Sequence, residues 1–332
     1  MNIPTLPHLN KWQENEPISG VSSPEIDPES DKGPAVVQFP DGDLYAFYKG
    51  ASSNNIYYVT MDADGNWSGN QQVQVDGTSL TTDKAPAATV FQGDIYLVYK
   101  KDGGSNHVKV AKFDGTTWYW GNSIDTLSNG DIDPSTSHNP AAAVFNDVLY
   151  IAYSGNGTDR MYLCWYDGKA WDGNKKIESD GNQLRCDEGP ALAPYNDLLY
   201  LCWQGNVSQE LYQATWDGEG NPAKDWENYG NIKASRGVKD QPRTNKYPTL
   251  VPFDGKLFLW YKGNHSDKIY QMFLKDQAWK ENVTISSLSD KDIQSDQAVG
   301  AGTYTPPNSR QEQVVMVYKS KSSNDLYEAK FY

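Results

Sequence analysis

A repeated motif whose last piece is displaced to the other end of the chain constrains the fold more than any other feature. The motif is an apolar run after a proline, then Leu/Ile-Tyr-x-x-Tyr, a polar loop, a second aromatic run and a tryptophan. Five copies are intact, whereas the sixth ends at Tyr332 without its tryptophan run. Residues 11–18, which include Trp12, supply such a run at the N-terminus. A chain whose first segment completes its last repeat is predicted to close into a ring.

The second aromatic residue of each Tyr-x-x-Tyr marks the repeat. Successive marks lie roughly 50–58 residues apart, a period typical of propellers and related repeat folds. These anchors are Tyr48, Tyr99, Tyr153, Trp203, Tyr261 and Tyr318. Short aromatic and β-branched runs bounded by Gly, Asn, Asp and Pro predict strands. In the first copy we expect strands at residues 35–39, 44–49, 56–61 and 67–73, which we name a to d.

We therefore expect an all-β fold, a six-bladed β-propeller with four antiparallel strands per blade. The N-terminal strand completes the last blade in this arrangement, so that no sheet edge stays open to other chains. Because the repeat covers nearly the whole chain, we expect one domain over residues 1–332. The expected blades cover residues of about 34–75, 85–126, 139–179, 189–234, 247–287, and 297–332 together with 10–19.

Composition argues against several classes of partner. The net charge of −14 disfavours nucleic acid and anionic membrane surfaces. No apolar run is long enough for membrane insertion. The N-terminus lacks the basic start and apolar stretch of a signal peptide, so we expect a cytoplasmic protein or one secreted without a signal peptide. The odd number of cysteines, 3, implies no disulfide framework, and the oligomeric state stays open.

The corner between strands c and d carries a family resemblance. The run Thr-Met-Asp-Ala-Asp-Gly-Asn-Trp at residues 60–67 resembles the Asp box, Ser-x-Asp-x-Gly-x-Thr-Trp, and looser copies lie at residues 113–118 and 166–171. The Asp box occupies the same corner in sialidase-like propellers and in propeller lectins, including the six-bladed fucose-binding type. The resemblance implies this architecture and a structural role for the box. We expect the tryptophan of each corner to be a packing residue: Trp12, Trp67, Trp118, Trp171, Trp226 and Trp279.

The b–c and d–a loops emerge on one face of a propeller, and here they repeat an aromatic residue, a cation and a carboxylate or amide. An aromatic ring packs against the C–H face of a sugar, while polar groups bind its hydroxyls. We expect repeated carbohydrate sites, on this loop face or between blades, that gain strength through multivalency. The candidate residues are Tyr48, Lys49, Asn54, Tyr99, Lys100, Asn106, Tyr153, Asp159, Arg160, Arg185, Asp187, Trp203, Gln204, Tyr261, Lys262, Asp267, Tyr318, Lys319 and Asn324.

Structural roles compete with this interpretation. The four loop lysines among these candidates have Asp or Asn residues in the preceding d–a loop, such as Asp31 before Lys49 and Asp83 before Lys100. Lysine and aspartate in neighbouring loops can pair and stabilise blade contacts instead of binding a ligand. Glycine and asparagine in the same loops are ordinary turn residues.

We expect a lectin whose partners are glycans or glycoproteins, with no catalytic residues. A sialidase-like glycoside hydrolase is the alternative, because Arg160, Arg185, Arg236 and Arg243 lie in adjacent blades. The family resemblance implies that sialidases bind a carboxylate with three arginines at the propeller centre. Against it, the Arg-Ile-Pro motif typical of that family is absent. A protein-interaction propeller without a sugar ligand is the third interpretation.

No cofactor or metal is expected. The four histidines are scattered over loops without the spacing of metal ligands. Acidic loops at residues 129–133 and 290–292 offer the oxygen ligands that Ca²⁺ takes, and Ca²⁺ is the alternative there. Neither loop matches an EF-hand, so we expect solvated acidic loops.

Overall fold

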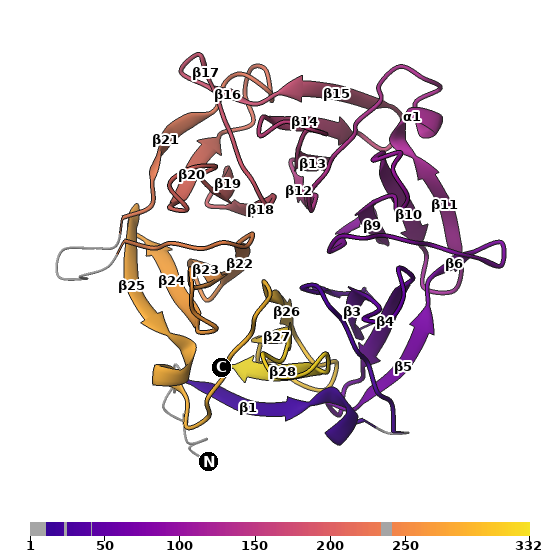
Figure 1. Ribbon diagram of the computed structural model, residues 1–332, viewed down its shortest axis with the longest axis vertical. Coiled ribbons are helices and arrows are strands. Elements are labelled where there is room, and N and C mark those ends of the chain that lie inside the picture. Colours follow the sequence, from indigo (N-terminus) through magenta and orange to yellow (C-terminus); the bar gives the residue numbers. More distant parts are fainter. Residues whose placement is uncertain (1–10, 23–24, 41, 234–240) are drawn as a thin grey trace.

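Six four-stranded antiparallel sheets are arranged radially around a central axis in the computed structural model (Figure 1). The structure describes residues 11–22, 25–40, 42–233 and 241–332. The ring confirms the predicted six-bladed β-propeller. Within the described residues the helices are short: η1 (Ile18–Gly20), α1 (Ile124–Leu127) and η2 (Ile285–Leu288). Each follows an outermost strand and begins the connection to the next blade.

The first three blades follow one another in the chain order a to d. Blade 1 is β2 (Ala35–Gln38), β3 (Leu44–Lys49), β4 (Ile56–Met61) and β5 (Trp67–Gln72). Blade 2 is β8 (Ala87–Phe91), β9 (Asp94–Lys100), β10 (Val108–Phe113) and β11 (Trp118–Ser123). Blade 3 is β12 (Ala141–Phe145), β13 (Val148–Ser154), β14 (Met161–Tyr166) and β15 (Trp171–Lys176). A small hairpin, β6 (Gln74–Val75) with β7 (Thr78–Ser79), projects between blades 1 and 2.

The other three blades repeat the arrangement. Blade 4 is β18 (Pro190–Tyr195), β19 (Leu198–Gln204), β20 (Leu211–Trp216) and β21 (Glu227–Asn231). Blade 5 is β22 (Thr249–Phe253), β23 (Lys256–Lys262), β24 (Ile269–Lys275) and β25 (Ala278–Thr284). Blade 6 is β26 (Gly300–Tyr304), β27 (Gln313–Lys319), β28 (Leu326–Phe331) and, from the N-terminus, β1 (Trp12–Pro17). A second hairpin, β16 (Glu178–Ser179) with β17 (Asn182–Gln183), precedes blade 4.

The N-terminal strand closes the ring as predicted. β1 runs antiparallel to the C-terminal strand β28, with Trp12 opposite Phe331 (Figure 1). The Trp12 ring is 2% exposed, and its centroid lies 5.3 Å from that of Phe331 and 5.7 Å from that of Trp260 in blade 5. Its Nε1 donates a hydrogen bond of 2.9 Å to Gln271 Oε1. The strand β1, which we call the latch strand, therefore joins blades 5 and 6 through apolar contact and one buried hydrogen bond.

The core consists of six apolar clusters, and each cluster joins two neighbouring blades. The cluster between blades 6 and 1, for example, joins Val315 and Leu326 to Val36 and Val59. The corner tryptophans belong to these clusters and are all buried, as expected: Trp12, Trp67, Trp118, Trp171, Trp226 and Trp279. Burial of large side chains between sheets is the main favourable term that holds the blades together.

The Asp-box corners are structural, as the resemblance implied. The Asp62 carboxylate accepts hydrogen bonds of 2.9 Å from the amides of Asp64 and Asn66. Asp114 accepts equivalent bonds of 2.8 Å from the two residues that precede Trp118. These amide donors, with Asn66 the main one for Asp62, hold the pKa of both carboxyls below their ordinary values. Each corner thereby fixes the turn that delivers the tryptophan to the core.

Every outermost strand carries a bulge near its middle, where its register with strand c shifts. One bulge residue adopts a positive φ, as at Asn70 (59°) and Asn174 (54°). A bulge bends the strand and re-aims a side chain. In blades 1, 3, 5 and 6 an asparagine at the bulge accepts a hydrogen bond from the anchor tyrosine of the same blade.

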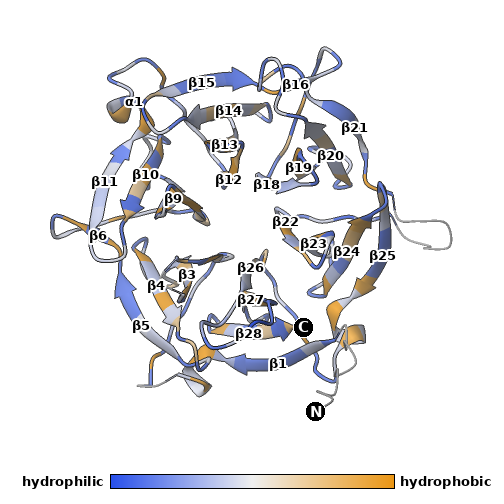
Figure 2. Ribbon diagram, turned by 180° about the vertical axis from the view of Figure 1, so that it is seen from behind, coloured by the Kyte–Doolittle hydropathy of each residue, from blue (hydrophilic) through white to orange (hydrophobic). Residues whose placement is uncertain are grey.

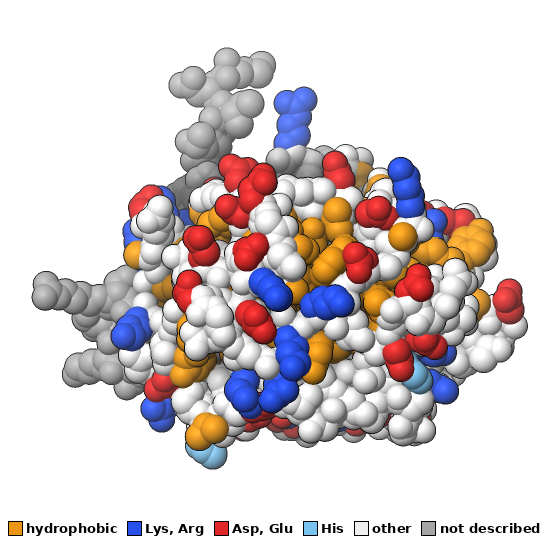
Figure 3. All heavy atoms as spheres, turned by 90° about the horizontal axis from the view of Figure 1, so that it is seen from above, with side chains coloured by type: hydrophobic (Ala, Val, Ile, Leu, Met, Phe, Trp, Pro, Cys, Tyr) orange, Lys and Arg blue, Asp and Glu red, His pale blue; other side chains and the backbone are white. Residues whose placement is uncertain are grey.

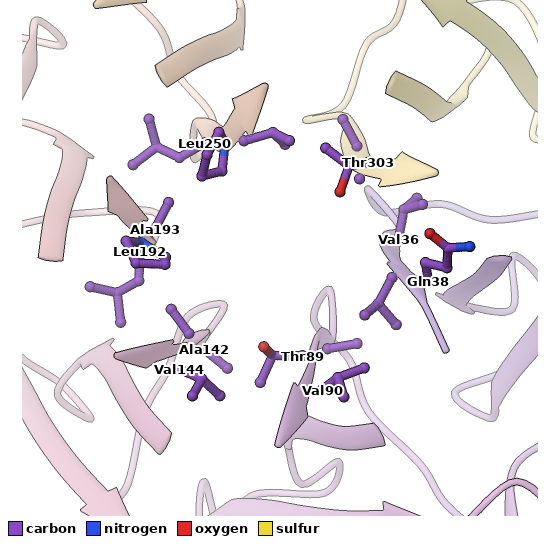
Figure 4. Close-up of a pocket in the computed structure, with 18 of the residues that line it drawn as sticks. Val36, Gln38, Thr89, Val90, Ala142, Val144, Leu192, Ala193, Leu250 and Thr303 are labelled. Carbon is purple, nitrogen blue, oxygen red and sulfur yellow. The ribbon is translucent and has the colours of Figure 1, made fainter. Parts of the chain in front are cut away.

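Small side chains from the innermost strands surround the axis. A cavity of about 600 Å³ lies there, lined by the innermost strands of all six blades (Figure 4). Its wall includes Ala142, Ala193 and Leu250, with Gln38 and Thr89 as polar groups. The a–b turn residues Phe39, Pro40 and Gly42 also line it, which places its mouth on the face opposite the b–c loops. The outermost strands, in contrast, are coloured largely hydrophilic (Figure 2).

Candidate functional site

The anchor aromatics are buried, and most donate to the bulge of their own blade. Each of the six is 1–2% exposed. Tyr153 Oη donates to Asn174 Oδ1 over 2.6 Å, and Tyr261 Oη donates to Asn282 Oδ1 over 2.5 Å. Burial raises the pKa of Tyr153 well above its ordinary value, so the hydroxyl stays a donor. Further residues of this class that were predicted for sugar contact are Tyr48, Tyr99, Trp203 and Tyr318.

The loop lysines are also buried, and they pair within the protein. Lys49 Nζ lies 2.9 Å from Asp31 Oδ1, and Lys100 Nζ lies 2.8 Å from Asp83 Oδ1. Lys319 pairs with Asp296, and Lys262 donates to Asn245, at the corresponding positions of blades 6 and 5. The competing structural interpretation thus describes these four side chains. Gln204, at the same position in blade 4, is buried at 3% exposure.

The predicted polar residues before strand c hold neighbouring loops together. Their main-chain carbonyls accept a hydrogen bond from the next d–a loop in all six blades, for example Thr82 N to Asn54 O at 2.7 Å. Several also bond through their side chains to the following blade: Asn54 Nδ2 donates to Asp102 over 2.8 Å, and Asn106 Nδ2 donates to Asn156 over 2.8 Å. The acceptor carbonyls belong to Asn54, Asn106, Asp159, Gln209, Asp267 and Asn324.

Two arginines form ion pairs at the loop face. Arg185 Nη1 lies 2.7 Å from Asp159 Oδ1, and its main chain bridges to Arg160. Arg243 pairs with Glu210 over 3.1 Å one blade further on. Arg236 lies outside the described residues. Asp187 sits in the d–a loop, half-buried, where burial raises the pKa of its carboxyl.

A glycine and a tyrosine seven residues later form the most regular feature of the loop face. The tyrosine on strand c stacks against the anchor aromatic, as in Tyr48–Tyr57 with centroids 5.8 Å apart and Tyr153–Tyr162 at 5.9 Å. A Cβ on Gly50 would lie 2.8 Å from the Tyr57 ring. Glycine is therefore required where this ring approaches the b–c loop. The same geometry occurs for Gly155, Gly205 and Gly263 with Tyr162, Tyr212 and Tyr270.

A cleft of about 230 Å³ opens beside the stacked pair in blade 1. Asp27, Glu29, Tyr57, Asn70 and residues 50–53 line it. The two acidic side chains are exposed, and the Tyr57 ring is half-buried. Hydrogen bonding to Ser53, more than any other contact, lowers the pKa of Tyr57. The cleft thus combines an accessible aromatic face with carboxylates and an amide.

The equivalent cleft of blade 2 is larger, at about 390 Å³. The β6–β7 hairpin forms one wall, and Lys101, Lys109 and Trp120 contribute from blade 2. Hydroxyl and amide groups of Ser79, Thr81 and Asn122 line it as well. We call these two spaces the rim clefts. The blade 2 cleft lies near the lower end of the range of small-molecule pockets, about 300–1,000 Å³, and the blade 1 cleft lies below it.

Acidic residues recur at the position of Asp27. Asp133 and Asp292 also stand three residues before the buried Ser or Thr of their d–a loops. Burial is the main cause of the raised pKa values of the anchor tyrosines in blades 3 and 6, and the charges of Asp133 and Asp292 contribute to a smaller extent. Blades 1, 3 and 6 therefore share a stacked or tilted aromatic pair, a bulge asparagine and a carboxylate. On the side of the ring that Figure 3 shows edge-on, acidic and basic side chains are interspersed.

The described residues contain no group of three or more His, Cys, Asp or Glu side chains arranged to hold a metal. The absence of a cofactor stays a prediction. The described helices include none that is both long and apolar enough to cross a membrane.

Two patterns in the sequence mark the loop face, and the prediction used only the Asp and Asn residues of the second. One is the Gly-x₆-Tyr spacing, which pairs Gly50 with Tyr57. The other is a Ser/Thr-Asp/Asn pair before the innermost strands of blades 1, 2, 5 and 6, as in Thr82-Asp83. The hydroxyl accepts a bond of 3.1 Å from Lys84 N, and the carboxylate binds the loop lysine. The first pattern marks the cleft aromatics, and the second marks the residues that fix the loops.

No protein-family model matches this chain, and no curated protein sequence matches it. Solved structures, however, are similar in fold. Aleuria aurantia lectin, determined in complex with Fucα1-6GlcNAc, superposes with a TM-score of 0.61 at 12% identity, covering 92% of this chain and 93% of that one. The protein AofleA of Arthrobotrys oligospora has a TM-score of 0.68 at 14% identity, covering 97% and 87%.

A microbial sialidase is similar at the same level. Its TM-score is 0.62 at 13% identity, covering 95% of this chain and 68% of that one. Identities this low establish a shared fold alone, because one fold hosts many functions. The chain thus shares the six-bladed propeller fold with a fucose-binding lectin and with a sialidase.

Proposed function

We propose that this protein is a non-catalytic carbohydrate-binding propeller that binds glycans at several rim positions. The observation that carries the proposal is the rim cleft of blade 1, in which a half-buried tyrosine ring, an amide and two carboxylates face one space. A sugar ring stacks on the aromatic face, and its hydroxyls bond to Asp27, Glu29 and Asn70. The fucose-containing ligand of the Aleuria aurantia lectin supports a sugar as the ligand class.

Repetition supports binding at more than one place. Blades 1, 3 and 6 present the same set of groups, and blade 2 presents a larger cleft of different chemistry. Individual sites of this size bind weakly, but several on one rigid ring engage a glycan-coated surface together. Tyr48, Tyr153 and Tyr318, which were predicted to contact the sugar, would instead support the accessible rings by packing against them.

Two observations favour binding over hydrolysis. Glycoside hydrolysis generally uses two carboxyl groups on either side of the scissile bond, whereas the described wall of the axial cavity consists of Val, Ala, Leu, Thr, Pro, Gly, Phe and Gln. Arg160, Arg185 and Arg243 lie on the opposite, b–c loop face, and Arg185 and Arg243 already pair with carboxylates. The alternative, a sialidase-like hydrolase, draws on the similarity to the microbial sialidase.

A glycan array with purified protein tests the proposal. We expect binding to a subset of glycans, and a reduced signal for Tyr57→Ala, which removes the accessible ring of the blade 1 cleft. Tyr119→Ala is the matched control, because Tyr119 is 44% exposed on β11 and lines neither rim cleft. Absence of binding to every glycan would contradict the proposal and favour a protein-interaction propeller.

Hydrolysis is tested in parallel with fluorogenic sialosides and arabinofuranosides. We expect no release of fluorophore above a buffer blank. Turnover that Arg185→Ala abolishes would establish the enzymatic alternative instead.

A further inference from the structure

Blade 2 departs from the repeat at two positions that face the same rim cleft. Where blades 1, 3, 4 and 5 have glycine after strand b, and blade 6 has Ser320, blade 2 has Lys101. Where the other five blades have tyrosine on strand c, blade 2 has Lys109. The register confirms the correspondence, because Lys109 pairs with Tyr99 as Tyr57 pairs with Tyr48. The ring and the glycine that must accommodate it are thus both replaced by lysine.

The double replacement changes the shape of the cleft. Without a tyrosine ring against the b–c loop, the space grows from about 230 Å³ in blade 1 to about 390 Å³ in blade 2. Lys109 Nζ is held at the cleft wall by a hydrogen bond of 2.8 Å to the bulge carbonyl of Gly121. Lys101, in contrast, is exposed at the mouth. One cation is therefore fixed, and the other is free to close over a ligand.

The two lysines of this cleft differ from most of the other loop lysines in having no acidic partner among the described residues. Lys49 and Lys100 each have an aspartate partner within 3 Å, whereas Lys101 and Lys109 take part in no ion pair among the described residues. Burial and the charge of Lys101 lower the pKa of Lys109, so the two cations act on each other. Asp76 is the one acidic residue that lines the cleft, and nearby Asp102 accepts from Asn54. Two unneutralised cations in one cleft attract an anion.

We propose that the blade 2 rim cleft binds the anionic group of an acidic sugar, a carboxylate or a sulfate, between Lys101 and Lys109. The hydroxyls and amide of Ser79, Thr81 and Asn122 bond to the sugar ring. The inference rests on the proposed function and gives one cleft a ligand class different from that of blades 1, 3 and 6. The chain has a net charge of −14, so this cleft attracts an anionic sugar locally, whereas the remainder of the surface repels it.

Binding of paired probes by isothermal titration calorimetry tests the inference. The probes are methyl β-glucuronide and the methyl glycoside of N-acetylneuraminic acid for carboxylates, and glucose 6-sulfate for sulfate, with methyl β-glucoside as the neutral match. We expect at least one acidic probe to bind about tenfold or more tightly than the neutral match, with affinity that falls as salt rises. The carboxylate and sulfate arms distinguish the two sources of charge.

Variants assign the binding to the cleft. Lys101→Gln with Lys109→Gln should abolish the preference for the acidic probe, and Lys101→Glu, at an exposed position, should do so without affecting folding. Lys169→Gln with Lys275→Gln is the matched control, because it removes the same charge from exposed c–d turns on the opposite face. Equal loss in the control, or an unchanged preference in both cleft variants, would overturn the assignment.

The array separates this inference from the proposed function. Binding of neutral glycans with no preference for acidic probes would refute only the blade 2 assignment. Binding of acidic probes that depends on Lys101 and Lys109, without binding of any neutral glycan, would support the assignment and refute repeated sites in the other blades. Absence of all glycan binding would refute both.

Discussion

The two halves of the ring join their blades differently. Between blades 4 and 5, 5 and 6, and 6 and 1, the corner tryptophan donates to a polar side chain, buried or half-buried, on strand c of the preceding blade. The pairs are Trp279 to Gln213 at 2.5 Å, Trp12 to Gln271 at 2.9 Å and Trp67 to Glu328 at 2.7 Å. In the other half, the corresponding residues on strand c are Tyr58, Val110 and Leu163. One half therefore uses directional bonds, and the other uses apolar contact.

The half of the ring that is joined by tryptophan hydrogen bonds is also the half in which the two ends of the chain meet. The strand β1 has no short chain connection to β28, so its position depends on the antiparallel pairing of the two strands and on side-chain contacts. A buried hydrogen bond is costly to leave unmade, and it therefore specifies register more strongly than apolar contact does. The bond of Trp12 ties β1 to blade 5, and the bond of Trp67 ties β28, the partner strand of β1, to blade 1. The apolar half consists of blades continuous in the chain, where register follows from short turns.

Loss of the latch tryptophan should have the largest effect on stability. Trp12→Ala removes a fully buried ring between blades 5 and 6 and leaves Gln271 with one tryptophan donor, Trp260. We expect a loss of about 3–5 kcal/mol in the free energy of unfolding, measured by denaturant titration. Tyr119→Ala is the surface control, expected within about 0.5 kcal/mol. Equal stability of the two variants would show that β1 does not hold the ring.

The junction between blades 6 and 1 differs from the other two, because the acceptor of its tryptophan is a carboxyl group, that of Glu328. Burial raises the pKa of Glu328 to about 7, while Lys330 at 3.3 Å and the bond from Trp67 oppose that rise. A carboxyl whose pKa is raised on folding contributes stability below its unfolded pKa of about 4.5, and this contribution is lost as pH rises through about 7.

Glu328→Gln should remove this dependence, because glutamine occupies the same position in blades 4 and 5 and keeps an acceptor for Trp67. We expect the variant to match the wild type near pH 4 and to exceed it by up to about 3 kcal/mol at pH 8. Melting temperatures of both proteins across this range provide the measurement. A difference independent of pH would contradict a neutral Glu328 in the folded protein at low pH.

A smaller contrast sharpens the comparison of the two halves. Trp67→Phe removes the donor to Glu328, whereas Trp118→Phe removes an Nε1 that has no partner within the described residues. Both variants lose similar apolar area, so the difference between them isolates the hydrogen bond. We expect Trp67→Phe to cost about 2 kcal/mol more than Trp118→Phe, by denaturant titration. Equal costs would mean that the directional bonds add nothing to closure.

The fold could be predicted because the repeat carries it. Strands alternate with turn residues at a constant period, and the displaced tryptophan run around Trp12 requires closure. The predicted strand at residues 44–49 coincides with β3, and that at residues 56–61 coincides with β4. Local chemistry determines both, because aromatic and β-branched runs end at Gly, Asn or Asp whatever the rest of the chain does.

The candidate site was harder to predict, because the pattern shows which residues recur but not which way they face. Tyr48 and Lys49 are consecutive residues of the repeated motif, and both are buried. The Tyr48 hydroxyl bonds to the bulge of its own blade, and Lys49 pairs with Asp31. The accessible ring is Tyr57, one strand away. Its position depends on the d-strand bulge and on Gly50, both of which are consequences of three-dimensional packing.

The number and position of bound sugars per chain test the central claim most directly. A crystal structure with the best glycan of the array, supported by native mass spectrometry, provides both. The account predicts more than one sugar per chain, in rim clefts such as that beside Tyr57. A single sugar held at the axis, with the rim clefts empty at saturation, would contradict it.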